Sequence, residues 1–158
     1  MGQHLKPGSR PVRVAALAAT LWLAPACEDQ SYRSIGSEIG LLTARNDGLV
    51  VPAIERLRGF GRHALPQIEI ALHTASETGR RNLINALYAI GDAEAVPILR
   101  HFAVYDVTAD IRAQCETILD GWAGIGSPRA EAARAALKRI GELRLQGEGP
   151  VAARPAAL

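Results

Sequence analysis

The feature that most constrains this sequence is a glycine turn that recurs three times between apolar helical segments. The middle copy spans residues 90–99 and reads IGDAEAVPIL, and related turns occupy residues 60–68 and 125–130. The glycines of these turns are spaced by 30 (91 − 61) and 35 (126 − 91) residues. A period in this range is typical of stacked helical hairpins, in which each unit buries its apolar face against the next one.

Each part of the turn has a mechanical reason. Gly91 follows a helix that ends at Ile90, and a glycine can adopt the left-handed conformation that closes a last helical turn without a Cβ clash. Pro66 and Pro97 fall in the first turn of the helix that follows, where the missing backbone N–H had no partner. The motif therefore predicts a helix, a sharp turn and a second helix.

Apolar residues around the turns recur at intervals of three and four, and nothing alternates with period two. The spacing predicts helical hairpins at 49–75, 79–105 and 109–141, with Leu87 and Leu99 in the core of the middle one. A further helix over residues 34–45 is expected to cap the first hairpin. We therefore expect an all-α fold, an α-solenoid of about three stacked helical hairpins with an N-terminal capping helix.

Residues 80–99 resemble the short bacterial HEAT repeat, the class first recognised in phycobilisome lyase subunits. The family's repeat has an Arg that opens the first helix, an Ala-Leu pair inside it, an Ile-Gly-Asp that closes it and an Ala-Val-Pro that starts the second. All four elements are present here, at 80–81, 86–87, 90–92 and 95–97. By this resemblance Arg112 takes the place of Arg81 one repeat later. The resemblance covers residues 47–141 and implies a HEAT-like superhelix.

Residues 1–26 have the pattern of an export signal. Three basic residues precede an uncharged stretch over 14–26, which is shorter than the roughly 20 apolar residues that span a bilayer and ends in Ala24-Pro25-Ala26. Cys27 follows directly, as in a lipoprotein signal, where the cysteine is lipidated and becomes the first mature residue. Simple secretion with cleavage before Cys27 fits the same pattern. We expect a membrane-anchored lipoprotein of the bacterial cell envelope, with a soluble periplasmic or secreted protein as the alternative.

The predicted organisation has four parts: the signal peptide (1–26), a polar tether (27–33), the HEAT-like solenoid domain (34–145) and a disordered tail (146–158). Three of the 18 basic residues lie in the signal, so the remaining 15 face 16 acidic ones and the net charge becomes about −1. No basic stripe is interleaved with aromatic residues, which argues against a nucleic-acid partner. The other cysteine, Cys115, lies on an apolar stripe and is expected in the core. We expect a monomer.

The sequence offers no constellation for catalysis, metal binding or a cofactor. The histidines at 63, 73 and 101 lie on separate segments, and no serine has a nearby histidine partner. Asp106 and Asp110 flank a helix start, where Asp106 or Thr108 can act as a cap. What remains is a curved ridge formed by the second helices. Its exposed residues, which we predict as a protein-binding surface, are Gln67, Glu69, His73, Arg100, His101 and Tyr105.

These observations favour a non-catalytic protein-binding or scaffold module. The partner is a protein of unknown identity, and the membrane is contacted through Cys27 alone. Two alternatives stay open. The resemblance suggests a chromophore-lyase-like enzyme or a subunit of one, and the signal suggests a secreted accessory subunit of an envelope complex.

Overall fold

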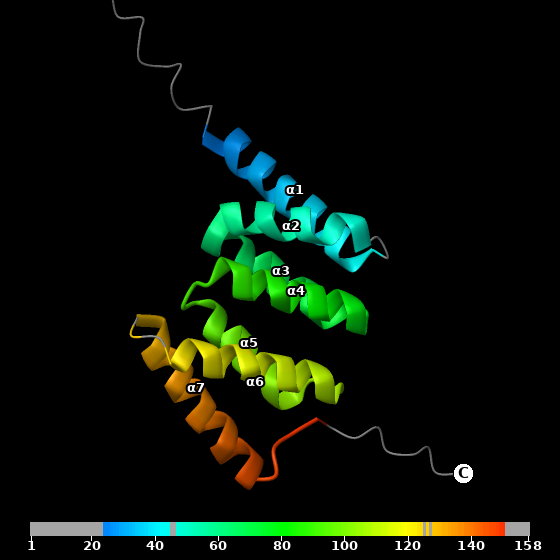
Figure 1. The fold of residues 1–158 in the computed structure, drawn as a ribbon. Helices are drawn as coiled ribbons and strands as arrows, with labels where there is room; N and C mark the ends of the chain where they lie inside the picture. Colours follow the sequence, from blue (N-terminus) through cyan, green and yellow to red (C-terminus); the bar gives the residue numbers. More distant parts are fainter. Residues whose placement is uncertain (1–23, 45–46, 125, 127, 151–158) are drawn as a thin grey trace, which may run out of the picture.

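A computed structural model describes residues 24–44, 47–124, 126 and 128–150, and this part of the chain is a row of helices (Figure 1). Its elements are α1 (Ala24–Thr43), α2 (Asp47–Phe60), the short 3-10 helix η1 (Gly61–Ala64), α3 (Leu65–Thr74), α4 (Glu77–Ile90), α5 (Ala95–Tyr105), α6 (Ala109–Ala123) and α7 (Pro128–Leu145). No strand occurs among these residues, so the prediction of an all-α, HEAT-like solenoid is confirmed. None of the described helices is long and apolar enough to cross a membrane.

The helices form two layers between a helix at each end. α2, α4 and α6 lie side by side in one layer, α3 and α5 lie in the other, and α1 and α7 close the two ends (Figure 1). The apolar core runs without a break from Ile35 in α1 to Ile140 in α7. Leu87 and Leu99 are fully buried in its middle, which confirms the predicted register of the helices.

Of the three helix pairs that the sequence predicts, the third is confirmed, because α6 packs closely on α7. The other two pairs differ. The expected hairpins join α2 to α3 and α4 to α5, but in the described structure α1 packs on α2, α3 on α4 and α5 on α6. The reason lies in the connections. Only Ala75 and Ser76 separate α3 from α4, whereas α4 and α5 are joined by a four-residue turn at 91–94 that leaves the two helices further apart. The predicted pairing within 49–75 and 79–105 is therefore wrong by one helix, whereas that within 109–141 is confirmed.

Two of the three glycine turns have the predicted geometry. Gly61 and Gly91 adopt positive φ angles of 58° and 65°, and the N–H of Gly91 closes α4 on the carbonyl of Leu87. The third turn begins earlier than the sequence motif suggests. α6 already ends at Ala123, and Gly124 caps it in a right-handed conformation.

The ends of the chain differ from the predicted organisation. α1 begins at Ala24, so residues 27–33 are helical and the first helix starts ten residues before the expected 34. Nothing between Pro25 and Gly36 breaks a helix, and a proline at the start of a helix is well tolerated. At the other end, residues 146–150 form an ordered turn in which the N–H of Glu148 bonds to the carbonyl of Leu143. Residues 1–23 and 151–158 lie outside the described part.

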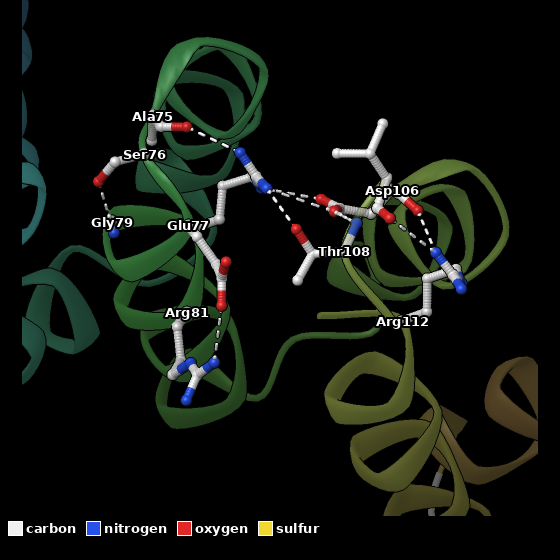
Figure 2. A network of polar contacts seen from close by, with 10 residues as sticks. Ala75, Ser76, Glu77, Gly79, Arg81, Asp106, Thr108 and Arg112 are labelled. Carbon is white, nitrogen blue, oxygen red and sulfur yellow. Dashed lines mark hydrogen bonds and ion pairs between the residues drawn. The ribbon is translucent and has the colours of Figure 1, made fainter. Parts of the chain in front are cut away.

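A buried ion pair joins the start of α4 to the turn between α5 and α6 (Figure 2). Arg80 Nε lies 2.9 Å from Oδ2 of Asp106, although its N–H does not point at that oxygen, and Nη2 donates to Oδ1 at 3.4 Å. Asp106 is the buried acidic residue of the described chain, 7% exposed. Thr108 adds to the network, because its hydroxyl accepts from Arg80 and its N–H donates to Asp106 Oδ1. The residue pattern predicts a helix cap by Asp106 or Thr108 at this point and not an ion pair; Thr108 is the N-cap residue of α6, without a capping bond from its side chain.

Arg112 repeats the role of Arg80, not that of Arg81. Arg80 and Arg112 are each the fourth residue of their helix, α4 and α6. Each donates from Nη1 to a carbonyl five residues earlier, Arg80 to Ala75 at 2.9 Å and Arg112 to Val107 at 3.2 Å. The equivalence of Arg112 with Arg81 that the resemblance suggests is therefore wrong by one residue.

We predict that Asp106→Ala lowers the free energy of unfolding by about 3 kcal/mol, because it leaves the guanidinium of Arg80 buried without its counter-charge. Asp110→Ala is the matched control: Asp110 lies 3.8 Å from Arg81 with 79% of its side chain exposed, and we expect a loss of about 0.5 kcal/mol or less. Urea denaturation monitored by circular dichroism measures both. Equal losses for the two variants contradict a stabilising role for the buried pair.

Candidate functional site

The structure brings together three of the six predicted ridge residues. His73 of α3 and His101 of α5 contact edge to face, with ring centroids 5.7 Å apart, and the centroids of His101 and Tyr105 are 5.1 Å apart. Phe102 packs behind both histidines, at 5.3 Å from each. With the Arg80–Asp106 pair, these rings line a shallow hollow of about 190 Å³. The cluster of polar rings fits a contact surface for a protein.

The end of the chain covers part of this surface. The hydroxyl of Tyr105 donates to Glu148 at 2.6 Å, and this hydrogen bond raises the pKa of Tyr105 above its usual value. Arg144, in the last turn of α7, forms an ion pair with Glu116 and donates to the carbonyl of Ala103. The tail segment from 146 to 150 is therefore held against α5.

Of the other three ridge residues, Arg100 lies near enough to Tyr105 for its charge to act on that hydroxyl, whereas Gln67 and Glu69 have no described contact with the cluster. Gln67 donates to the carbonyl of Tyr32 at 3.2 Å and lines a small apolar hollow of about 130 Å³ between α1 and α3. Glu69 and Arg100 are exposed, and no described hydrogen bond or ion pair joins Glu69 to His73. Within the described residues no group of three or more His, Cys, Asp or Glu side chains is placed to hold a metal ion. The cysteine in this region, Cys115, is buried, and burial raises the pKa of its thiol to about 12.

A larger pocket lies between α4, α6 and the first turn of α7, and the sequence does not predict it. We call it the aromatic pocket, and its volume of about 870 Å³ falls in the range of small-molecule sites. The residues that line it are Asn85, Tyr88, Ala89, Gln114, Thr117, Ile118, Gly121, Trp122 and Arg129. Most of this lining is neutral, and much of it is apolar or aromatic.

Trp122 forms the floor of the aromatic pocket. Its indole is 2% exposed and lies nearly parallel to the ring of Tyr88, with an interplanar angle of 16° and a centroid distance of 6.4 Å. The guanidinium of Arg129 sits over the indole, 5.1 Å from its centroid. Tyr88 itself is 57% exposed. The exposed ring of Tyr88 and the planar guanidinium thus offer stacking surfaces at the pocket, and the buried indole of Trp122 supports both from below.

A pair of amides forms the polar edge of the pocket. Gln114 Nε2 of α6 donates to Oδ1 of Asn85 at 2.8 Å and to the carbonyl of Arg81 at 3.3 Å, so the two helices hold each other's amides in place. Fixed amides of this kind orient a ligand through its heteroatoms. The sequence places Trp122 on an apolar stripe as a core residue, which is correct for its burial. The pocket itself depends on the distance between α4 and α6, which local spacing does not encode.

Comparison with known proteins places the fold. The chain is similar to the solved complex of CpcE and CpcF of phycocyanin lyase from Nostoc sp. PCC7120, with 24% sequence identity and a TM-score of 0.55 over 68% of this chain and 65% of that one. A weaker likeness, to human deoxyhypusine hydroxylase solved in complex with glycerol, has 20% identity and a TM-score of 0.45 over 84% of this chain and 51% of that one. No family model and no curated protein matches the sequence.

The comparison corrects one expectation. The sequence favours a protein that is not an enzyme, but a solved structure with a similar fold comes from a lyase. The helical-repeat architecture is therefore one that enzymes use, and it gives no ground for a non-catalytic interpretation. The chain spans about two thirds of the length of its solved relative, 65%, and what the comparison establishes is the HEAT-like fold.

Proposed function

We propose that this protein is a subunit of a lyase-type enzyme that holds a planar conjugated group in the aromatic pocket while a protein partner supplies the reacting residue. The observation that carries the proposal is the pocket itself: about 870 Å³ with an indole floor, on a fold shared with a phycocyanin lyase. Volume and lining together suit a ligand of drug size or larger. Fold likeness by itself supports the reaction class only as an analogy.

The lining favours a flat ligand over a flexible one. Tyr88 presents an exposed ring that is backed by the nearly parallel indole of Trp122, and such a ring can stack on a conjugated ligand at little cost in side-chain entropy. The amides of Asn85 and Gln114 are held by each other and by backbone, so they can hydrogen-bond a ring substituent without reorganising. A pocket of this design binds and orients its ligand and keeps water from one of its faces.

The partner supplies what the pocket lining does not carry. The polar groups that line the pocket are amides, the hydroxyls of Thr117 and Tyr88, and the guanidinium of Arg129, which act as hydrogen-bond donors and acceptors. Positioning of this kind accelerates a reaction when a second protein brings its nucleophile or base to the bound group. The solved relative is itself a complex of two chains. We assign the partner contact to the ridge of α3 and α5, where His73, His101 and Tyr105 cluster.

We further propose that the mature protein works at a bacterial cell envelope, anchored through a lipid on Cys27. The support is the order of basic, apolar and small residues over 1–26, with the cysteine directly after them. A lipid on Cys27 would anchor the domain to the membrane surface rather than make it span the bilayer. Cys27 lies near the start of α1, so the anchor would follow directly onto the helical domain.

Expression in a bacterial host should give a mature chain that begins at Cys27 and carries lipid, because the signal ends at that residue. Mass spectrometry of the N-terminal peptide measures this, and Cys27→Ser is the control, which should leave the protein out of the membrane fraction. An intact Met1, or an unmodified Cys27 in soluble protein, contradicts the lipoprotein assignment.

Biliverdin, an open-chain tetrapyrrole, should bind with a red-shifted absorbance, and Gly121→Leu should weaken its binding at least tenfold. Gly121 lines the pocket and a Cβ there meets open space, so a leucine side chain fills the cavity without a clash. Gly141→Leu, on the exposed side of α7 with equally open space, is the matched control and should bind like the wild type. Equal binding by all three proteins, or none by the wild type, contradicts the proposed ligand site.

The triple change of Arg100, His101 and Tyr105 to Ala should abolish copurification of the partner from membranes while leaving helical content and melting temperature nearly unchanged. All three side chains are exposed on α5, so their removal costs contact area and not core packing. Replacing Arg134 and Lys138 on α7 is the control and should matter less. Full capture by the triple variant moves the partner contact away from the ridge.

A further inference from the structure

We propose that the aromatic pocket selects a planar ligand that carries an acidic group, and that Arg129 determines this specificity. The inference rests on the proposed function in one respect, namely that this pocket is the ligand site. It adds the charge of the ligand, which neither the fold nor the pocket volume specifies.

The charge of the pocket comes from one residue. Among the nine described residues that line it, Arg129 is the one with a charged side chain, and no carboxylate is among them. The pocket therefore has a formal charge of +1 beside a largely apolar wall. A charge near an apolar wall is less screened than one in open solvent, so an acidic group on the ligand gains more from it.

The guanidinium of Arg129 is only partly satisfied. Nη1 donates to the carbonyl of Gly91 at 2.6 Å, while Nε is buried and has no hydrogen-bond partner. No described bond uses Nη2 either. Nε and Nη2 form one edge of the guanidinium, and an arginine edge with two N–H groups is suited to a carboxylate, sulfonate or phosphate. A donor left without a partner in a buried position is unfavourable, and an acidic ligand removes that penalty.

The position of Arg129 in its helix also favours an acidic ligand. It lies in the first turn of α7, where the helix dipole disfavours a cation and favours an anion. The backbone N–H groups of a first turn also lack partners within the helix and add to the attraction for an anion. A bound acidic group would therefore meet the guanidinium of Arg129 over the indole of Trp122, beside a helix end whose dipole favours an anion.

A purely structural role is the competing explanation. Arg129 ties α7 to the turn after α4 through the carbonyl of Gly91, and a Cβ at Gly91 would lie only 2.5 Å from Nη1. Arg134 offers a close comparison, because it also lies on α7 and donates from Nη1 to a backbone carbonyl, that of Ala123 at 2.8 Å. Arg134 does not line the pocket.

Two fluorescent probes with the same aromatic frame separate these roles. The full chain is titrated with 1-anilinonaphthalene-8-sulfonate, which carries an acidic group, and with N-phenyl-1-naphthylamine, which lacks it. We expect the wild type to bind the sulfonate at least about tenfold more tightly than the neutral probe. Arg129→Met should bring the two dissociation constants within about twofold, whereas Arg134→Met should keep the wild-type preference.

Each other outcome overturns the proposal. If Arg129→Met lowers the melting temperature but keeps the preference for the sulfonate, Arg129 is a structural link and not a specificity residue. If the wild type binds both probes equally and Gly121→Leu weakens both, the aromatic pocket is a ligand site but does not select an acidic group. If Gly121→Leu leaves the binding of both probes unchanged, the probes bind elsewhere, and both this proposal and the proposed ligand site fail.

Discussion

The ion pair between Arg80 and Asp106 is the interaction on which the middle of this solenoid depends. It joins the first turn of α4 to the turn between α5 and α6, so it sets how one helical layer lies on the next. Burying two charges is costly, and the pair is stable because further hydrogen bonds satisfy it, from Arg80 to Ala75 and Thr108 and from the N–H of Thr108 to Asp106. The geometry of the turn and the geometry of the pair therefore require each other.

Two surfaces lie on either side of this pair. The ridge cluster of α3 and α5 lies over it, since the pair lines the same shallow hollow as His73 and His101. The aromatic pocket lies on the other layer, where its shape depends on the distance between α4 and α6, and Gln114 bridges that gap to Asn85. A protein contact on the ridge and a ligand in the pocket would thus share one rigid frame, although they occupy separate faces.

α7 is both the end cap of the solenoid and one wall of the pocket. Its last turn is attached to α5 and α6 through Arg144, and the residues after it reach Tyr105 through Glu148. Its first turn is attached to the turn after α4 through Arg129. An end helix normally leaves one face wet. Here the amino end of that helix also completes the site, which explains why the pocket lies at this end of the repeat array.

Local patterns in the sequence were sufficient to predict the helices, the left-handed glycines at 61 and 91 and the buried positions of Leu87, Leu99 and Cys115. These depend on interactions within a few residues of chain and on the helical period. Two of the three predicted helix pairs were wrong and only that of α6 with α7 was right, because periodicity shows which face of a helix is buried but not which neighbour covers it. For the same reason, the resemblance matched Arg112 to Arg81, whereas in the structure it takes the role of Arg80.

The sequence by itself therefore determined the class of fold, the positions of two of its three glycine turns and most of its core, since each of these follows from local conformational preference. Only the tertiary structure decided the ion pair of Arg80 with Asp106, 26 residues apart, and the pocket that joins Tyr88 and Trp122 to Arg129. Both arise from side chains on different helices. The distances between these side chains depend on the spacing that each turn imposes on the helices it joins. From sequence position alone, a charged side chain is predicted to lie on the surface and an aromatic one in the core. Its contact on another helix is known only from the tertiary structure.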